Sequence, residues 1–219
     1  MSTPDGSRQA LLPQWEALGR ALGHAGPAWS REGRKLLRYW ARWPRQYHDT
    51  RHLAACLRHA EAHRAQFRDP EAVLLALWYH DAIYWPWSKH NEEDSAVWAA
   101  RFLRARGLAA TRIATVERHI LATKAHGAGD DPDTAWVLDI DLAVLGADEA
   151  AYRWFERGVR SEYRWVPWKR YVAGRSAVLG GFLRRQRIYL TEAFHERYDA
   201  PARTNLQEAL DALAQGRTF

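Results

Sequence analysis

The sequence predicts an all-α fold, a single compact helical bundle, and three observations lead to this prediction. Helix signals dominate, and no stretch alternates polar with apolar residues for long enough to form a strand. Prolines preceded by capping residues recur where helices begin, and glycines recur where apolar periods stop. The chain of 219 residues is long enough to bury roughly 70% of the surface that its unfolded form exposes.

Helix boundaries follow from these residues in chain order. Asp69-Pro70 and Asp131-Pro132 each place an aspartate cap before a proline in the first turn, and Ala200-Pro201 predicts a further start. Gly107 and Gly146 each predict a helix end. We therefore expect helices over residues 8–23, 30–42, 49–67, 70–81, 91–106, 111–124, 133–145, 148–164, 168–185 and 201–215.

The composition is that of an ordinary globular chain, with 47% hydrophobic and 26% charged residues, except for its twelve tryptophans. Many of these indoles must pack in a core or line a cleft. No apolar run approaches the ~20 residues of a membrane span, and the N-terminus lacks the pattern of a signal peptide. We therefore expect a cytoplasmic protein that does not enter a membrane. The single cysteine, Cys56, is expected to be a small buried core residue.

Lysine plus arginine number 32 and aspartate plus glutamate 26, which leaves a net charge of +6. This balance favours anionic partners, although solvated helix surfaces account for the same charge. A nucleic-acid partner is not expected, because no recognised binding motif is present and the aromatic residues are not interleaved with a basic stripe.

Three short segments carry side chains that bind metal ions, and they read YHDTRH, YHDA and LDIDL. His48 and His52 are four residues apart, so both imidazoles project from one face of a helix. His80 and Asp81 adjoin at the end of an apolar helix, where burial without a partner is costly. Asp141 stands in another very apolar helix, which pushes an unpaired carboxylate towards its neutral form. A cation bound by all of these side chains would offset the free-energy cost of burying them.

Each of these signals alone has an ordinary reading as a core histidine, a polar pair at a helix end or a chance acid. The ordered set is a stronger signal than any member. Imidazole and carboxylate ligands together suit Mn, Mg, Fe, Co, Ni or Zn, and the absence of thiolates argues against a closed structural zinc site. We therefore expect one divalent ion with coordination positions left for water.

The order His, then His-Asp, then Asp in an all-helical chain resembles the HD superfamily of metal-dependent phosphohydrolases, over residues 45–145. The longer strings LWYHDAIY, NEEDSA, LDIDLAVLG and EYRWVP are similar to one subgroup of predicted HD phosphohydrolases without an assigned substrate. The resemblance implies a single HD-type domain over 1–219, with its core at 45–145 and a helical extension at 148–219.

The resemblance also implies roles for individual residues, with metal ligands at His52, His80, Asp81 and Asp141. It implies that His48 donates a proton to the leaving oxygen, against the alternative of a helix-entry residue bonded to backbone. Asp139 competes with Asp141 for the last ligand position. Because residues two apart point to different sides of a helix, only one of the two should face the ion, and Asp139 would then orient a ligand.

Further side chains near these segments are candidates for catalysis and substrate binding. Some nucleotidases of the superfamily carry a glutamate shortly after His-Asp, and Glu92 or Glu93 could replace it here. Asn91 stands where binuclear members supply further histidines, which favours a single ion. An alternative explanation is that Asn91, Glu92 and Glu93 are ordinary residues of a helix's first turn, where the helix dipole favours acids. Candidates for contact with phosphate or a base, each with packing or solvated surface as the alternative, are Tyr84, Lys124, His126 and Arg175.

We therefore expect an enzyme that cleaves a phosphoester or phosphoanhydride of a nucleotide or another small phosphorylated metabolite, using metal-activated water. The main alternative is a non-catalytic module that keeps the metal site, binds a phosphorylated ligand and signals through conformation. The aromatic and basic segment 163–171 fits a cap over the cleft, internal packing or the interface of a homodimer.

Overall fold

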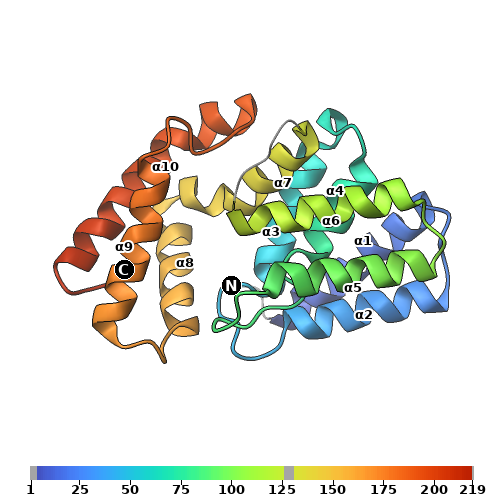
Figure 1. Cartoon of the computed structure of the whole chain (residues 1–219), viewed down its shortest axis with the longest axis horizontal. Coiled ribbons are helices and arrows are strands. Elements are labelled where there is room, and N and C mark those ends of the chain that lie inside the picture. The colour runs from blue at the N-terminus through green and yellow to red at the C-terminus, as the bar shows by residue number, and fades with distance from the viewer. Residues whose placement is uncertain (1–3, 126–130, 219) are drawn as a thin grey trace. The chain divides into compact units, whose positions relative to one another are not determined.

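Helices form the regular structure of this protein (Figure 1). The structure is a computed structural model and describes residues 4–125 and 131–218. No strand occurs within those residues, so the predicted all-α fold is confirmed. The α-helices are α1 (Pro4–Ala21), α2 (Pro27–Trp40), α3 (Thr50–Ala62), α4 (Pro70–Tyr79), α5 (Asn91–Ala105), α6 (Ala110–Ala125), α7 (Pro132–Leu142), α8 (Glu149–Glu162), α9 (Trp168–Leu183) and α10 (Glu192–Ala214), and short 3₁₀ helices cover Arg64–Gln66 (η1) and Ala143–Gly146 (η2).

Contacts divide the chain into two compact units, Met1–Ile140 and Asp141–Phe219. Helix α7 lies almost wholly in the first unit, and its last two residues open the second. The expectation of one domain over the whole chain stays a prediction.

Two of the three predicted proline starts are confirmed. The carboxylate of Asp69 accepts a hydrogen bond from the backbone N–H of Ala72 at 3.1 Å, and Asp131 accepts one from the N–H of Asp133 at 3.1 Å. The end predicted at Gly107 is also confirmed. This glycine has φ 76°, and the next residue donates back into the last turn of α5.

The start predicted at Pro201 is wrong, because α10 begins at Glu192 and carries this proline inside it. The carboxylate of Asp199 accepts from the Nε of Arg203 at 2.6 Å, so one side-chain pair spans the proline. Phe194 and Leu206, on either side of it, are both fully buried. Packing of the whole helix therefore outweighs the backbone hydrogen bond that the proline removes.

The core of the first unit contains packed tryptophans, as the composition predicts. The rings of Trp15 and Trp29 stack at 4.7 Å, and each indole donates to the carbonyl oxygen of the other at 2.8 Å. Glycine is required at Gly33, because a Cβ there would lie 2.3 Å from Trp15. These contacts fix α1 against α2 and bury the indole N–H groups with partners.

The second unit is held by polar contacts as well as by its apolar core. The amide of Asn205 in α10 donates to the carbonyl oxygens of Leu145 and Ala147 at 2.8 and 2.9 Å. Gly146 permits this approach, because a Cβ there would lie 2.5 Å from the carbonyl oxygen of Tyr198. The helix predicted to end at Gly146 ends at Leu142, and η2 follows it.

None of the helices within the described ranges is long and apolar enough to cross a membrane. The cytoplasmic location, the phosphorylated substrate and the homodimer stay predictions.

Candidate metal centre

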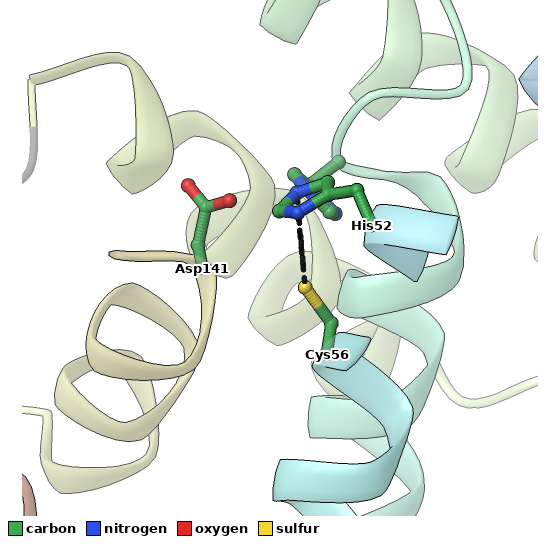
Figure 2. Close-up of side chains that lie close together, drawn as sticks. His52, Cys56 and Asp141 are labelled. Atoms are coloured by element: carbon green, nitrogen blue, oxygen red, sulfur yellow. Dashed lines mark hydrogen bonds between the residues drawn. The ribbon is translucent and has the colours of Figure 1, made fainter. Parts of the chain in front are cut away.

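Four side chains place their donor atoms within 4.8 Å of one another, and they are His52, Cys56, His80 and Asp141 (Figure 2). The first two lie on α3, the third follows α4 and the last lies in α7. The two imidazoles and the thiol are buried, whereas the carboxylate is partly exposed. Two nitrogens, one sulfur and one carboxylate oxygen form a donor set compatible with a divalent metal ion.

Local helix signals place the first imidazole. Asp49 caps α3 by accepting from the backbone N–H of Arg51 at 2.7 Å, so the helix starts at Thr50. His52 is the third residue of that helix, and Cys56 lies four residues further on the same face. A cap directly before the first residue of the helix therefore sets the direction of both side chains.

A backbone contact orients the second imidazole. His80 ends α4, and its Nδ1 lies 2.9 Å from the carbonyl oxygen of Leu77. Since a carbonyl oxygen only accepts, Nδ1 carries the proton and Nε2 keeps its lone pair. Such a carbonyl contact is the usual way in which a protein fixes the tautomer of a metal-binding histidine.

The two Nε2 atoms of His52 and His80 lie 3.3 Å apart. Two nitrogen ligands at 2.0–2.1 Å from a tetrahedral ion would be about 3.3 Å apart, so the separation fits shared coordination. Without a cation, Nε2 of His52 must instead carry the proton and donate it to His80. Both arrangements are consistent with the geometry, and metal binding therefore requires the neutral form of both rings.

Cys56 was expected to be a core residue, and it is buried, yet its sulfur also belongs to this group. The structure therefore places one sulfur atom beside the predicted ligands, where the sequence predicted none. The sulfur lies 3.7 Å from Nε2 and 3.8 Å from Nδ1 of His52, where a tetrahedral site would place a sulfur and a nitrogen ligand about 3.6 Å apart. The spacing of four residues after His52 was the signal in the sequence, masked by the apolar pattern around it.

Asp81 and Asp139 lie beside this group rather than in it. A carboxylate oxygen of Asp81 is 3.5 Å from Nε2 of His80, so this predicted ligand reaches the neighbourhood of the second imidazole. Asp139 is fully buried, two residues before Asp141 on α7. Of Asp139 and Asp141, only Asp141 belongs to the group whose donor atoms lie close to the imidazoles.

Arg45 connects the two loops at the site, although no sequence motif singled it out. Its guanidinium donates to the carbonyl oxygens of His48 at 2.7 Å, Asp81 at 2.7 Å and Ala82 at 3.1 Å. The side chain is 8% exposed and lies over the ring of Tyr84. This arginine therefore fixes the turn before α3 against the turn after α4.

His48 packs in the turn just before α3. Its ring stacks on Tyr84 at a centroid separation of 4.3 Å and lies 5.9 Å from the ring of His52. The structure thus brings the predicted acid close to the imidazole pair. It also gives Tyr84, a predicted substrate contact, a packing partner in His48.

Glu93 and Lys124, each predicted separately as a catalytic candidate, form an exposed ion pair with each other. The ammonium group also donates to the carbonyl oxygen of Lys89. The hydrogen bond from Lys124 lowers the pKa of the Glu93 carboxyl. Glu92 differs. Burial first, and then the negative charge of Asp81, raise the pKa of its carboxyl.

The remaining candidates lie elsewhere. The amide of Asn91 accepts from the N–H of Trp85 and donates to its carbonyl oxygen, each at 3.0 Å, and so closes the loop after Asp81. Arg175 belongs to the second unit and forms a buried ion pair with Glu156. His126 lies outside the described residues.

Comparisons with known proteins add no relative. No protein-family profile matches the chain, and no curated protein and no solved structure matches it. The resemblance to HD phosphohydrolases therefore depends on this chain's own residues.

Proposed function

We propose that the protein is a metal-dependent phosphohydrolase of the HD type, with one divalent cation held by His52, His80 and Asp141 and with Asp81 as a further ligand. The observation that carries the proposal is the 3.3 Å separation of the two buried Nε2 atoms, one of them fixed as an acceptor by the carbonyl of Leu77. The ordered resemblance of these residues to that superfamily supports it.

The bound cation would lower the pKa of a coordinated water and polarise a phosphoryl oxygen. We assign the base to Glu92 rather than to Glu93, which is paired with Lys124. The raised pKa of the Glu92 carboxyl makes it a better proton acceptor than an ordinary glutamate.

His48 is the proposed acid. Its ring stands beside that of His52, its carbonyl is held by Arg45, and Tyr84 covers one face. These contacts hold the imidazole in one orientation, which a proton donor to the leaving oxygen requires. A small phosphorylated molecule, such as a nucleotide, is the proposed substrate class.

One observation favours the non-catalytic alternative. If Cys56 is a ligand, the four donors of the group fill a tetrahedral coordination sphere and leave no position for water. A closed site of this kind stabilises a fold without turnover. However, the sulfur is almost equally far from both nitrogens of His52, which fits packing against the ring as well as ligation.

The experiment is elemental analysis of the purified protein followed by phosphate release from a panel of nucleotides, with His80→Ala and Cys56→Ser beside the wild type. We expect His80→Ala to lose both metal and turnover, and Cys56→Ser to keep turnover. His24→Ala, which removes an imidazole packed on Trp29, is the matched control. Equal phosphate release by His80→Ala would attribute the activity to contamination. Bound metal without turnover, lost in Cys56→Ser, would establish the closed site instead.

A further inference from the structure

A groove in the first unit gathers positive charge. It has a volume of about 440 Å³ and is lined by residues of α2 and the end of α5. Its cationic lining residues are Arg31, Arg34, Lys35, Arg38 and Arg106, and one carboxylate, Glu32, accompanies them. The groove therefore carries a local excess of positive charge in a chain that is already basic.

The four cations of α2 lie along one face of that helix. Residues 31, 34, 35 and 38 follow the spacing i, i+3, i+4 and i+7, so their side chains form a stripe about 10 Å long. Like charges at these spacings repel one another and cost free energy. An anion bound along the stripe would remove that cost.

The chain does not neutralise this stripe. Arg31, Arg34 and Arg38 are exposed, and none of them forms an ion pair with a carboxylate of the residues that the structure describes. Elsewhere arginines do so, as Arg112 does with Asp69 at 2.8 Å. The guanidinium groups of the groove are therefore free to bind a solute.

Glu32, the one carboxylate among the residues that line the groove, already accepts hydrogen bonds within the protein. Glu32 accepts from the phenol of Tyr79 at 3.1 Å and from the indole of Trp98 at 2.5 Å. Arg106, from the end of α5, has a buried Nε that makes no hydrogen bond within the described part of the chain. An oxygen of a bound anion would give this donor the partner that buried N–H groups usually have.

We propose that this groove binds a small anion that carries several linked phosphate groups, such as the polyphosphate part of a nucleotide. Arginine suits this ligand because its planar fork pairs with phosphate oxygens, and several arginines in a line favour linked phosphates over a single one. The groove is a site apart from the candidate metal centre. Glu92 and Arg106 stand at opposite ends of α5, about 21 Å apart along its axis.

The test is calorimetric titration of the full chain with tripolyphosphate and with orthophosphate. The double variant Arg34→Ala/Arg38→Ala should weaken tripolyphosphate binding by about 100-fold, since each lost charged hydrogen bond is worth about tenfold. Arg101→Ala/Arg104→Ala, which removes the same charge from exposed positions of α5 outside the groove, should bind like the wild type. His80→Ala should also bind like the wild type, which separates this site from the metal centre.

Three outcomes would overturn the proposal. Equal losses in the two double variants would show that diffuse charge binds the anion. Orthophosphate binding as tightly as tripolyphosphate would remove the requirement for linked phosphates. A single-stranded oligonucleotide that binds more tightly than tripolyphosphate, and loses affinity in the groove variant, would assign the groove to nucleic acid instead.

Discussion

Two polar clusters, the Arg175–Glu156 cluster and the candidate metal centre, satisfy their charged groups differently. In the second unit, Arg175 donates to both carboxylate oxygens of Glu156, at 2.5 and 3.2 Å, and the phenol of Tyr152 donates to the same acid at 2.9 Å. In the candidate metal centre, His52, Cys56, His80 and Asp141 supply only groups that bind cations, and the group contains no lysine or arginine. The comparison teaches that one cluster carries its own cation, whereas the other has a donor set compatible with a bound one.

The pKa values of the second cluster agree with this reading. Burial works against the charge on Arg175, but the adjacent Glu156 outweighs it, so the pKa of the guanidinium is raised. Burial also raises the pKa of Tyr171 to about 12. The charge of Arg175 is therefore engaged by Glu156, and the assignment of Arg175 to substrate binding stays a prediction.

The largest expected effect comes from breaking the cluster that carries its own cation. Arg175→Met leaves the carboxylate of Glu156 buried without its cation and should lower the free energy of unfolding by about 3–5 kcal/mol. Urea unfolding measures it, and adding Glu156→Gln should restore most of the loss. Arg153→Met, which breaks an exposed pair with Glu149, is the control and should change little. A loss in Arg175→Met no larger than in the control would contradict the comparison.

The next largest effect is expected when a divalent metal ion is added to the candidate metal centre. A divalent ion at 100 times its dissociation constant should stabilise the wild type by about 2.7 kcal/mol, and a chelator should remove the gain. His80→Ala should show neither change. Thermal melting with and without metal measures both, and an equal gain in the variant would place the ion somewhere else.

Arg45 offers a smaller, more local test of the metal site. Arg45→Met leaves the carbonyl oxygens of Asp81 and Ala82 without their buried donor, which should cost roughly 2 kcal/mol of stability. Because the turns on both sides of the site then lose their common anchor, metal affinity should fall by about tenfold. Metal titration of the folded variant measures the second effect, and unchanged affinity would show that Arg45 serves folding alone.

The smallest expected effect is a pH-dependent loss of stability when the charge of Asp199, in the second unit, is removed. Burial of Asp199 is outweighed by the N–H of Ile188 and by Arg203, which lower the pKa of its carboxyl below 3.8. A depressed folded pKa gives stability that is present above the unfolded pKa and is lost as the pH falls through the folded value. Asp199→Asn should therefore cost about 1 kcal/mol at neutral pH and progressively less below about pH 4. A cost that is constant across this range would contradict the charge assignment.

The sequence predicted the fold class and several helix limits because local chemistry sets them. Asp69, Asp131 and Gly107 act within one turn of their own positions, so their effects could be predicted without tertiary structure. The helix start predicted at Pro201 was wrong, because burial along the whole of α10 decides whether that helix continues. The limit expected between a core at 45–145 and an extension at 148–219 lies close to the boundary between the two units, which falls after Ile140.

The candidate site was predictable to the extent that its residues follow one another in short segments. His52, His80 and Asp141 were recognised by their order, and the structure brings their donor atoms together. Cys56 was missed because a cysteine in an apolar helix fits core packing equally well. Arg45 and the Arg175–Glu156 pair depend on partners that lie far along the chain, which no local pattern reveals.

The most direct test of the metal centre is equilibrium dialysis of the metal-free protein against Mn²⁺ and Zn²⁺, followed by measurement of bound metal per chain. The wild type should bind one ion per chain with at least one of these metals, and His52→Ala/His80→Ala should bind none at the same free concentration. Retention of one ion by the double variant, or no binding by the wild type, would contradict the assignment of these imidazoles as metal ligands.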